Sequence, residues 1–412
     1  MLPAFSSCKL LRPVLCCLST IFALSIMLSG TGCGSANSTA AFTQLPISPP
    51  PTYSEIYEFG DSITHGKGAI RLSMGYGSLL IADFAGGGTN FAVPGASSAD
   101  ESDVMLKNYN PQQSNNPAVT SMIGTNDLFI YGGNYRVFQA DVAGMMEWAT
   151  VPRNAKVFFT DAQCTSTGAW SNVATYGFPG GVEQSTTPSS TYTCAIVTTG
   201  PALYFGFMQD TGWTAGRMTI LIDGASPSSG ATIHSKNYYG SQETYKFTTV
   251  RYPLAAGSHT FTVTYAGTAG ATGTIAPVWL GSAYPISNNL PPRIFIADVP
   301  VQEANGNGSL IATYNAALMA VIEQLQGDGL PIVHVQENAA ASGSGGPLGT
   351  GWLNTDVDFV GGTVQGATCA PSDHLPLHPG NCGHAHLRDA FEYYIQPYRN
   401  TGSATLNSQP TE

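Results

Sequence analysis

The chain has 412 residues, of which 43% are hydrophobic and only 10% are charged. This length suits two domains or one domain with a large insertion, and the hydrophobic content argues against a globally disordered chain because a sizeable core can be buried. The formal net charge is −11, and the body of the chain has no basic cluster. These features argue against nucleic acid and anionic membrane surfaces as partners.

Residues 1–32 have the pattern of a signal peptide. Basic residues precede an apolar run at residues 14–28, and small residues then lead to Cys33. This pattern is typical of a cleaved leader rather than a spanning helix. Cys33 stands where bacterial lipoproteins carry their lipidated cysteine, although Gly30 replaces the usual Leu, so lipid anchoring and simple release both stay open. We expect residues 33–53, rich in Pro, Ser and Thr, to be a flexible linker.

The cysteines downstream of Cys33 also indicate export. They are Cys164, Cys194, Cys369 and Cys382. Four cysteines in an exported protein suggest two disulfides, and the local pairings are 164 with 194 and 369 with 382. The alternative is four free buried thiols. We therefore expect a periplasmic, cell-envelope or secreted protein that meets a membrane only through a possible lipid anchor.

The first part of the body, residues 54–160, alternates strands and helices. Residues 56–59, 89–93 and 119–123 are predicted strands, and residues 75–85 and 134–148 are predicted helices. Such alternation predicts a parallel sheet that is covered on both faces and binds ligands beyond the carboxyl ends of its strands.

Residues 161–285 lose the helical periodicity and become short alternating segments. These predicted strands are residues 192–197, 202–208, 217–222, 244–252 and 259–265, separated by turn pairs such as Asp223-Gly224. The pattern favours an all-β sandwich of the jelly-roll type.

The α/β pattern resumes in residues 286–400. Residues 293–299 and 331–335 are predicted strands, and residues 309–326 and 384–394 are predicted helices. The sandwich is therefore predicted to be an insertion between the two parts of one α/β domain. Residues 401–412 are predicted to be a flexible tail.

The stretch FGDSITHG, residues 59–66, follows the first predicted strand. Its glycines allow a sharp turn that presents Ser62, although Gly-Asp-Ser is also ordinary turn composition. A serine nucleophile needs partners, and three further stretches stand just past predicted strands or near the C-terminus. They are NFAVPG at 90–95, GTND at 124–127 and HPGNCGH at 378–384.

These four stretches, in this order, resemble those of the SGNH hydrolases, also called the GDSL esterase and lipase family. The resemblance covers roughly residues 53–160 and 287–400, and the sandwich lies outside it. It implies a flavodoxin-like, three-layer α/β/α domain with a parallel sheet, which hydrolyses carboxylic esters and uses neither a cofactor nor a metal.

The resemblance also implies a role for each matching residue. Ser62 becomes the nucleophile and His378 the general base, because an alcohol is a weak nucleophile until a base takes its proton. The backbone N–H groups of Ser62 and Gly95 and the Asn126 amide become the oxyanion donors. Loss of one such donor typically costs about 3–4 kcal/mol of barrier.

The third member of the triad departs from the family pattern. Family members usually have an Asp three residues before the catalytic His, where this sequence has Leu375. We favour Asp373, five residues before His378, as the group that orients the imidazole. Two alternatives stay open: His374 is the base with another acid, or a backbone carbonyl replaces the carboxylate.

Neighbouring polar residues have simpler interpretations. We expect Asp61 to be a structural cap, His65 to lie on a helix face and His384 to occupy a scaffold position. The histidines that could suggest zinc are His374, His378, His384 and His386, but their spacing fits no closed structural site.

The substrate is not specified by these motifs, because the family cleaves many esters and thioesters. Aromatic residues of the insert are candidates for stacking on sugars or, alternatively, core residues: Trp170, Tyr176, Tyr204, Trp213, Tyr238 and Tyr239. No amphipathic lid helix is evident, which favours a small ester or an acetylated carbohydrate as substrate. The alternatives are a lipase or thioesterase, and a glycan-binding envelope protein with weak or lost hydrolysis.

Overall fold

The structure is a computed structural model. It describes residues 52–109, 117–174, 178, 180–210, 216–234, 245–267, 273–282, 293–300, 308–337, 362–364, 367–369 and 378–399. The predicted signal peptide, Cys33 and the predicted tail lie outside these ranges. In the part of the chain that is described, no helix is long and apolar enough to cross a membrane.

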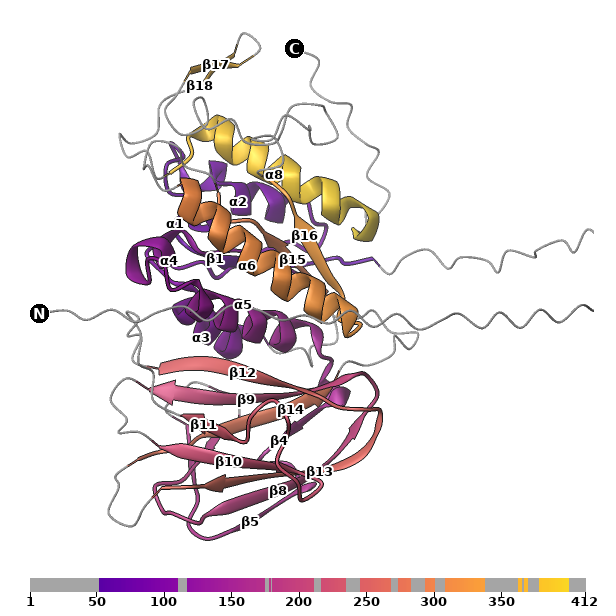
Figure 1. The fold of residues 1–412 in the computed structure, drawn as a ribbon. Coiled ribbons are helices and arrows are strands. Elements are labelled where there is room, and N and C mark those ends of the chain that lie inside the picture. Colours follow the sequence, from indigo (N-terminus) through magenta and orange to yellow (C-terminus); the bar gives the residue numbers. More distant parts are fainter. Residues whose placement is uncertain are drawn as a thin grey trace, which may run out of the picture. The chain divides into compact units, whose positions relative to one another are not determined.

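Five parallel strands form the central sheet of the α/β region (Figure 1). They are β1 (Ile56–Gly60), β2 (Gly88–Asn90), β3 (Ala118–Met122), β15 (Arg293–Ala297) and β16 (Ile332–Val335), in the order β16-β15-β3-β1-β2. This is the flavodoxin-like order, in which the direction of winding reverses between β1 and β3. Ligands of such sheets bind outside the carboxyl ends of the strands at this switch point. The predicted α/β class with a parallel sheet is confirmed.

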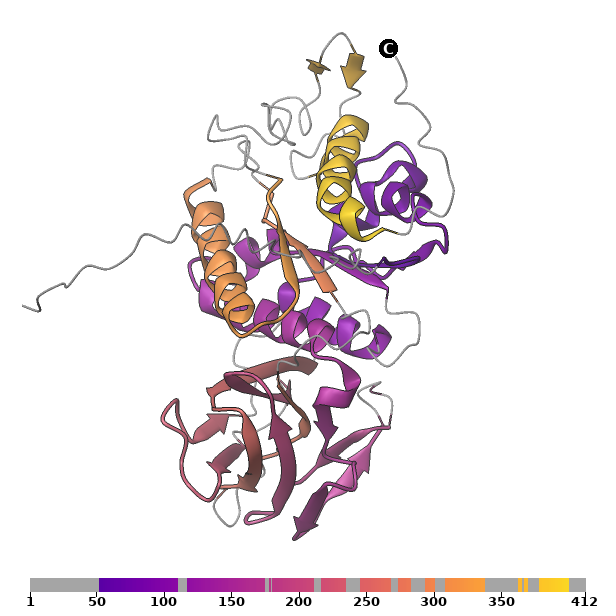
Figure 2. The ribbon, with the colours of Figure 1, turned by 90° about the vertical axis from the view of Figure 1, so that its right-hand side faces the viewer.

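Helices cover both faces of this sheet (Figures 1 and 2). On one face, α2 (Tyr76–Ala82) and α8 (Asn381–Ile395) pack in one hydrophobic cluster with the strands. On the other face, α3 (Ser98–Asn108), α5 (Tyr135–Thr150) and α6 (Gly308–Gly327) pack in a second cluster. The buried residues of α6 follow the helical period of its sequence: Ile311, Tyr314, Ala317, Leu318, Val321, Ile322 and Leu325.

Shorter elements complete the α/β region. They are α1 (Ser62–His65), η1 (Leu72–Met74), α4 (Thr125–Ile130), η2 (Arg153–Ala155), η4 (Gln396–Tyr398) and the antiparallel pair β17 (Gly362–Val364) and β18 (Ala367–Cys369). Of these, α1 and α4 follow β1 and β3 directly, so both lie at the edge of the sheet where the candidate site is expected.

The predicted β-sandwich is also confirmed, as two antiparallel sheets inserted between α5 and β15. The inner sheet contains β12 (Tyr245–Pro253), β9 (Ala202–Asp210), β14 (Pro277–Ser282) and β4 (Lys156–Phe158). The outer sheet contains β11 (Thr232–His234), β10 (Arg217–Ile222), β13 (Gly257–Tyr265), β8 (Thr191–Thr198) and β5 (Cys164–Thr167). A separate hairpin pairs β6 (Ser171–Val173) with β7 (Val182–Gln184).

The two sheets of the sandwich differ in burial. Every residue of β14 is buried, whereas along β13 Phe261, Val263 and Tyr265 point inward and the threonines between them are partly exposed. A strand covered on both faces has a nearly continuous buried run, and a strand with one solvated face alternates. The inner sheet is therefore covered on both faces.

The second cover of the inner sheet is the helix layer of α3 and α5. Trp148 of α5 makes edge-on ring contacts with Phe158, Phe178, Phe247 and Trp279, at centroid distances between 5.8 and 6.2 Å. These rings belong to the same hydrophobic cluster as residues of the parallel sheet. The α/β region and the sandwich therefore share one core.

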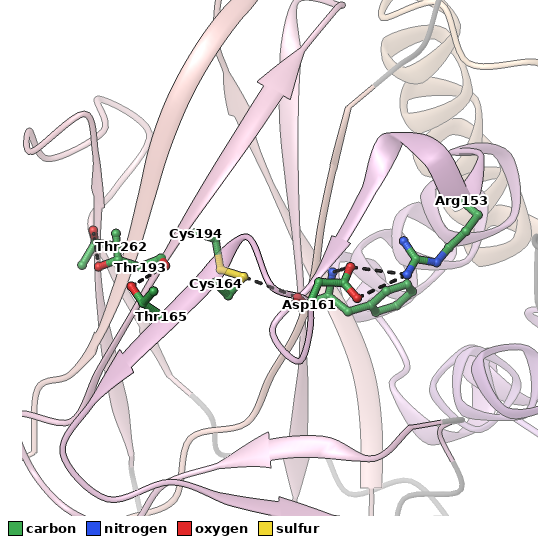
Figure 3. Close-up of a disulfide and its surroundings, with 8 residues drawn as sticks. Arg153, Asp161, Cys164, Thr165, Thr193, Cys194 and Thr262 are labelled. Carbon is green, nitrogen blue, oxygen red and sulfur yellow. Dashed lines mark hydrogen bonds and ion pairs between the residues drawn. A yellow bond between two sulfur atoms is a disulfide. The ribbon is translucent and has the colours of Figure 1, made fainter.

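A disulfide between Cys164 and Cys194 joins the edge strand β5 to β8 (Figure 3). This pairing is confirmed, and it is typical of proteins of oxidising compartments. Thr165, Thr193 and Thr262 lie across three neighbouring strands beside it, as Figure 3 shows. The side chains of Cys369 and Cys382 lie outside the described part of the structure, so their pairing stays a prediction.

Candidate active site

The turn after β1 holds Ser62 in a conformation that requires glycine at position 60. Gly60 has φ +153°, and a Cβ there would lie 2.1 Å from Thr64 Oγ1 and 2.5 Å from the Met122 carbonyl oxygen. Asp61 is the N-cap of α1, and its carboxylate accepts a hydrogen bond of 2.9 Å from the Ile63 N–H. Asp61 is therefore the structural cap that the sequence predicted. Ser62 is the first residue of α1.

Ser62 and His378 are in direct contact. Ser62 Oγ lies 2.9 Å from His378 Nε2, and both residues are buried. Gly68 allows this approach, because it has φ +96° and a Cβ there would lie 2.3 Å from the Pro379 carbonyl oxygen. At 2.9 Å the imidazole is within the reach that a general base needs to accept the hydroxyl proton.

The proposed orienting acid and the alternative base belong to the same short segment before His378. Asp373, Leu375 and the alternative base His374 all lie outside the described residues. Asp373 as the acid, His374 as the base and a carbonyl-assisted dyad therefore stay predictions.

Gly95 and Asn126 lie at the same edge of the sheet as Ser62. Gly95 has φ +86° in the loop after β2, and Asn126 is the second residue of α4, after β3. The Val93 N–H donates to the Gly60 carbonyl at 3.0 Å, and the Asn126 amide donates to the Ala96 carbonyl at 2.8 Å. The three loops are thus tied together. A primary amide has two N–H donors, so Asn126 can also donate to a substrate oxygen. The oxyanion role of both residues stays a prediction.

His384 links helix α8 to the segment that follows α1. Its Nδ1 accepts from the Tyr76 N–H at 3.3 Å, and its Nε2 lies 3.0 Å from the Lys67 carbonyl oxygen. This pair of partners fixes a neutral imidazole with its proton on Nε2. Burial lowers the pKa of His384 to about 4, so the ring stays neutral. His384 is therefore a scaffold residue, as the sequence predicted.

Buried carboxyl groups surround the turn that holds Ser62. Glu101 of α3 accepts the Gly60 N–H at 2.7 Å, and burial raises its pKa well above the ordinary value. Burial also raises the pKa of Glu58 to about 8 and that of Asp61 to about 7. Among the described residues, neither carboxyl oxygen of Glu58 has a hydrogen-bond partner. Glu101 was not predicted as part of this site, because helix α3 was not predicted.

Exposed apolar side chains occur on the segments that follow β1, β2 and β3. Most of the large exposed hydrophobic residues in the described ranges belong to this apolar rim, which consists of Ile70, Leu72, Met74, Val93, Phe129 and Ile130. Ile70 is 68% exposed and Phe129 is 56% exposed. The Ile70 N–H donates to the Asn381 side chain at 3.0 Å, which places the first loop beside the start of α8 and thus close to His378.

Two of the six candidate aromatic residues of the insert, Trp170 and Tyr204, lie in the described part of the structure. Tyr204 is buried, and its hydroxyl donates to Asp328 at 2.8 Å, so it is a core residue and not a stacking platform. Trp170 packs edge-on against Tyr192 at 4.6 Å between ring centroids. The other four candidates lie outside the described residues: Tyr176, Trp213, Tyr238 and Tyr239.

Comparison with known proteins finds no matching family model and no curated protein of similar sequence. Several solved structures are similar at low identity. A two-domain esterase active on acetylated mannans, co-crystallised with mannopentaose, is 11% identical and has a TM-score of 0.34, over 57% of this chain and 92% of that chain. A family two carbohydrate esterase from Cellvibrio japonicus is 12% identical with a TM-score of 0.23, over 34% of this chain and 38% of that chain. A family 35 carbohydrate binding module from Clostridium thermocellum is 14% identical with a TM-score of 0.24, over 31% of this chain and 98% of that chain.

Proposed function

We propose that the protein is a serine ester hydrolase that forms an acyl-enzyme on Ser62. The observation that supports this proposal is the 2.9 Å contact between Ser62 Oγ and His378 Nε2, which joins two distant parts of the sequence at the carboxyl end of β1. A buried hydroxyl that contacts an imidazole is the arrangement from which nucleophilic catalysis starts.

The reaction follows from these groups. Ser62 Oγ attacks the ester carbonyl carbon while its proton moves to His378 Nε2. The negative charge that develops on the carbonyl oxygen accepts hydrogen bonds from the Ser62 and Gly95 N–H groups and the Asn126 amide. Collapse of this intermediate expels the alcohol, which takes the proton from His378. Water then attacks the acyl group in the same way and releases the acid, with Asp373 as the proposed orienting carboxylate.

We propose a short-chain ester, such as a carbohydrate O-acetyl group, as the substrate. An acetyl group needs little space around the nucleophile, and Ser62 is 8% exposed in a closely packed turn. The shared core holds the sandwich firmly against the α/β region, so a polysaccharide held by the sandwich would stay in register with the enzyme. Acetylated mannan, the substrate class of one of the similar esterases, is the polymer to test.

The apolar rim favours a second candidate, an ester with a longer acyl chain or a lipid. Six exposed apolar side chains lie on the segments that follow β1, β2 and β3, the strands whose carboxyl ends share an edge of the sheet with Ser62: Ile70, Leu72, Met74, Val93, Phe129 and Ile130. Burying such side chains against an alkyl chain is favourable by roughly 25 cal/mol per Å² of apolar surface. A series of p-nitrophenyl esters from acetate to octanoate separates the two candidates by the chain length at which kcat/KM is highest.

The proposal is tested by hydrolysis of p-nitrophenyl acetate and release of acetate from acetylated mannan. We expect Ser62→Ala and His378→Ala to lower kcat by at least about 10³-fold. Asp373→Asn should reduce it sharply if Asp373 orients His378. His65→Ala is the matched control, because His65 lies in the same helix α1 as Ser62 and is partly exposed.

One outcome would contradict the proposal, and a further measurement would then favour an alternative. Equal rates of hydrolysis by the wild type and Ser62→Ala on every ester would rule out the proposed hydrolase function. Retention of the Ser62→Ala variant on an acetylated mannan column in that case would favour the glycan-binding alternative.

A further inference from the structure

A buried ion pair connects the sandwich to the α/β region. Lys246 of strand β12 pairs with Asp141 of helix α5, and their side chains are 5% and 0% exposed. A buried charge costs several kcal/mol unless it is paired and hydrogen-bonded. A pair of apolar side chains would hold β12 against α5 equally well. The presence of an ion pair at this position therefore needs another explanation.

The ion pair continues into a chain of buried polar groups. Asp141 Oδ2 accepts from the Ser98 hydroxyl at 3.1 Å. The Ser98 N–H donates to Asp127 Oδ2 at 2.9 Å, and the Ser98 hydroxyl also contacts the Asp127 carboxyl group. Ser98, Asp127 and Asp141 are all fully buried. The network therefore runs without interruption from β12 through α5 and the first residue of α3 to α4.

The protons of this network depend on Lys246. A serine hydroxyl has one proton, so a full hydrogen bond between Ser98 and each of the two carboxyl groups requires that one carboxyl group carries a proton of its own. Burial raises the pKa of Asp127 to about 7, and the charge of Asp141 raises it as well. Burial also raises the pKa of Asp141, but the neighbouring Lys246 opposes this. Lys246 therefore favours the ionised form of Asp141 over that of Asp127.

The network ends on the two segments that carry the proposed oxyanion donors. Asp127 directly follows Asn126, and Ser98 stands three residues after Gly95. The Asn126 amide donates to the carbonyl of Ala96, between Gly95 and Ser98. Any shift of Ser98 relative to Asp127 therefore changes the position of Gly95 relative to Asn126.

We propose that Lys246 is a positioning residue for the oxyanion hole, so that the inserted sandwich holds the donors of the α/β region in place. This inference rests on the proposed function. Lys246 acts through Asp141, Ser98 and Asp127 and does not touch the substrate. Donors that act on the developing oxyanion contribute to the transition state more than to substrate binding, so their displacement lowers kcat and leaves KM nearly unchanged.

The test compares two ion pairs of the same strand. Arg251 of β12 pairs with Asp328 just after α6, with Nε 2.6 Å from Oδ2, and Tyr204 donates to the same carboxyl group. Lys246→Met and Arg251→Met each remove one ion pair between the sandwich and the α/β region. We expect Lys246→Met to lower kcat on p-nitrophenyl acetate by about 10-fold or more, with KM changed by less than about 2-fold. Arg251→Met should keep kcat within about 2-fold of the wild-type value. Lys246→Arg keeps the positive charge and should retain most of the wild-type activity.

A second measurement is the rate at which a fluorophosphonate probe labels Ser62, since its attack also develops charge on an oxygen in the oxyanion hole. We expect this rate to fall in parallel with kcat for Lys246→Met at a temperature where circular dichroism shows the variant to be folded. If Lys246→Met does not fold, the pair Lys246→Gln with Asp141→Asn removes both charges and conserves volume. The same loss of kcat is expected there.

The failures of the two proposals are distinguishable. An active wild type with equal kcat values for Lys246→Met and Arg251→Met would overturn the positioning role and leave the ester hydrolase in place. A wild type as inert as Ser62→Ala would overturn the hydrolase, and the positioning role with it.

Discussion

The α/β region and the inserted sandwich bury polar groups in different places. In the α/β region, buried acids, serines and histidines surround Ser62 or lie behind it, on α3, α4, α5 and α8. The core between the two sheets of the sandwich consists of aromatic and aliphatic side chains with the disulfide. Among the described residues, the buried charged residues of the sandwich are Lys156 and Lys246, both on the inner sheet. Polar groups are buried at a cost, so their distribution favours the α/β region and its boundary with the sandwich as the place of the proposed chemistry.

The shared core gives the largest expected effect. Trp148→Ala should lower the free energy of unfolding by about 3–5 kcal/mol, because Trp148 packs against rings of the sandwich within the α/β core. We expect urea unfolding followed by near-UV circular dichroism and by esterase activity to give one coincident transition. Trp170→Ala, at the edge of the sandwich core, is the control and should cost less. Two separate transitions would mean that the regions unfold independently.

The disulfide tests whether the outer sheet matters only for stability. The variant with both Cys164→Ala and Cys194→Ala loses a cross-link between residues 30 apart in the sequence. A chain-entropy model predicts a loss of roughly 3–4 kcal/mol. Thermal unfolding should shift accordingly, while kcat at 25 °C stays unchanged. A lower kcat in the folded variant would extend the catalytic influence of the sandwich to its outer sheet.

The close approach at Gly68 tests the α/β region alone. In Gly68→Ala the new methyl group would collide with the Pro379 carbonyl and move His378 away from Ser62. We expect kcat/KM to fall by about 100-fold, since misplacement by 1 Å has effects of this size. Gly87→Ala is the matched control, because Gly87 also has a positive φ of +70° but open space around it. Equal activities of the two variants would contradict the contact between the two loops.

The buried acids of the α/β region predict an unusual pH dependence of stability. Burial raises the pKa of Glu58 to about 8 from an ordinary value of 4.5, so the folded protein keeps a proton that the unfolded chain releases. The contribution of this proton to the free energy of unfolding is full below pH 4.5. It is lost as the pH rises through 8, at up to about 1.4 kcal/mol per pH unit. We expect the wild type to be more stable at pH 5.5 than at pH 8. Glu58→Gln should flatten this slope and raise the unfolding free energy at pH 8 by about 1–2 kcal/mol. An unchanged slope in urea titrations would count against a buried neutral Glu58.

The apolar rim gives the smallest expected effect. Leu72→Ser and Phe129→Ser should lower kcat/KM for p-nitrophenyl octanoate by about 2- to 5-fold relative to the acetate, since a few methylene groups lose apolar contacts. Val197→Ser is the control, because Val197 is 64% exposed on strand β8 of the outer sheet. If all three variants keep the same ratio, the rim does not contact the acyl chain.

The regular elements of the fold could be predicted where burial follows hydrophobicity. The period of α6 and the alternation of β13 are visible in the sequence, and both elements were predicted within two residues of their bounds. Helix α3 was missed because its buried positions include Ser98, Asp100 and Glu101. The capping box of Ser97 and Asp100 was the available signal, and it alone would have located the start of this helix.

The candidate site could be predicted only as far as its motifs. The order of the stretches around Ser62 and His378 allowed their contact to be predicted, because each stretch follows a predicted strand or precedes a predicted helix. The pair of Lys246 and Asp141 could not be predicted, because it depends on how the inner sheet packs against α5. No local pattern in either segment contains that information.

The insertion also determines the order in which the two regions can be completed during synthesis. Strand β3 pairs with β15, which the ribosome delivers about 170 residues later. At roughly 5–20 residues per second this delay is on the order of 10–30 seconds. All strands of the sandwich emerge within that interval, so the sandwich can assemble on α3 and α5 while one edge of β3 is still unpaired. A nascent chain that stalls between β14 and β15 therefore exposes an unpaired edge of β3, which is a template for pairing with another chain.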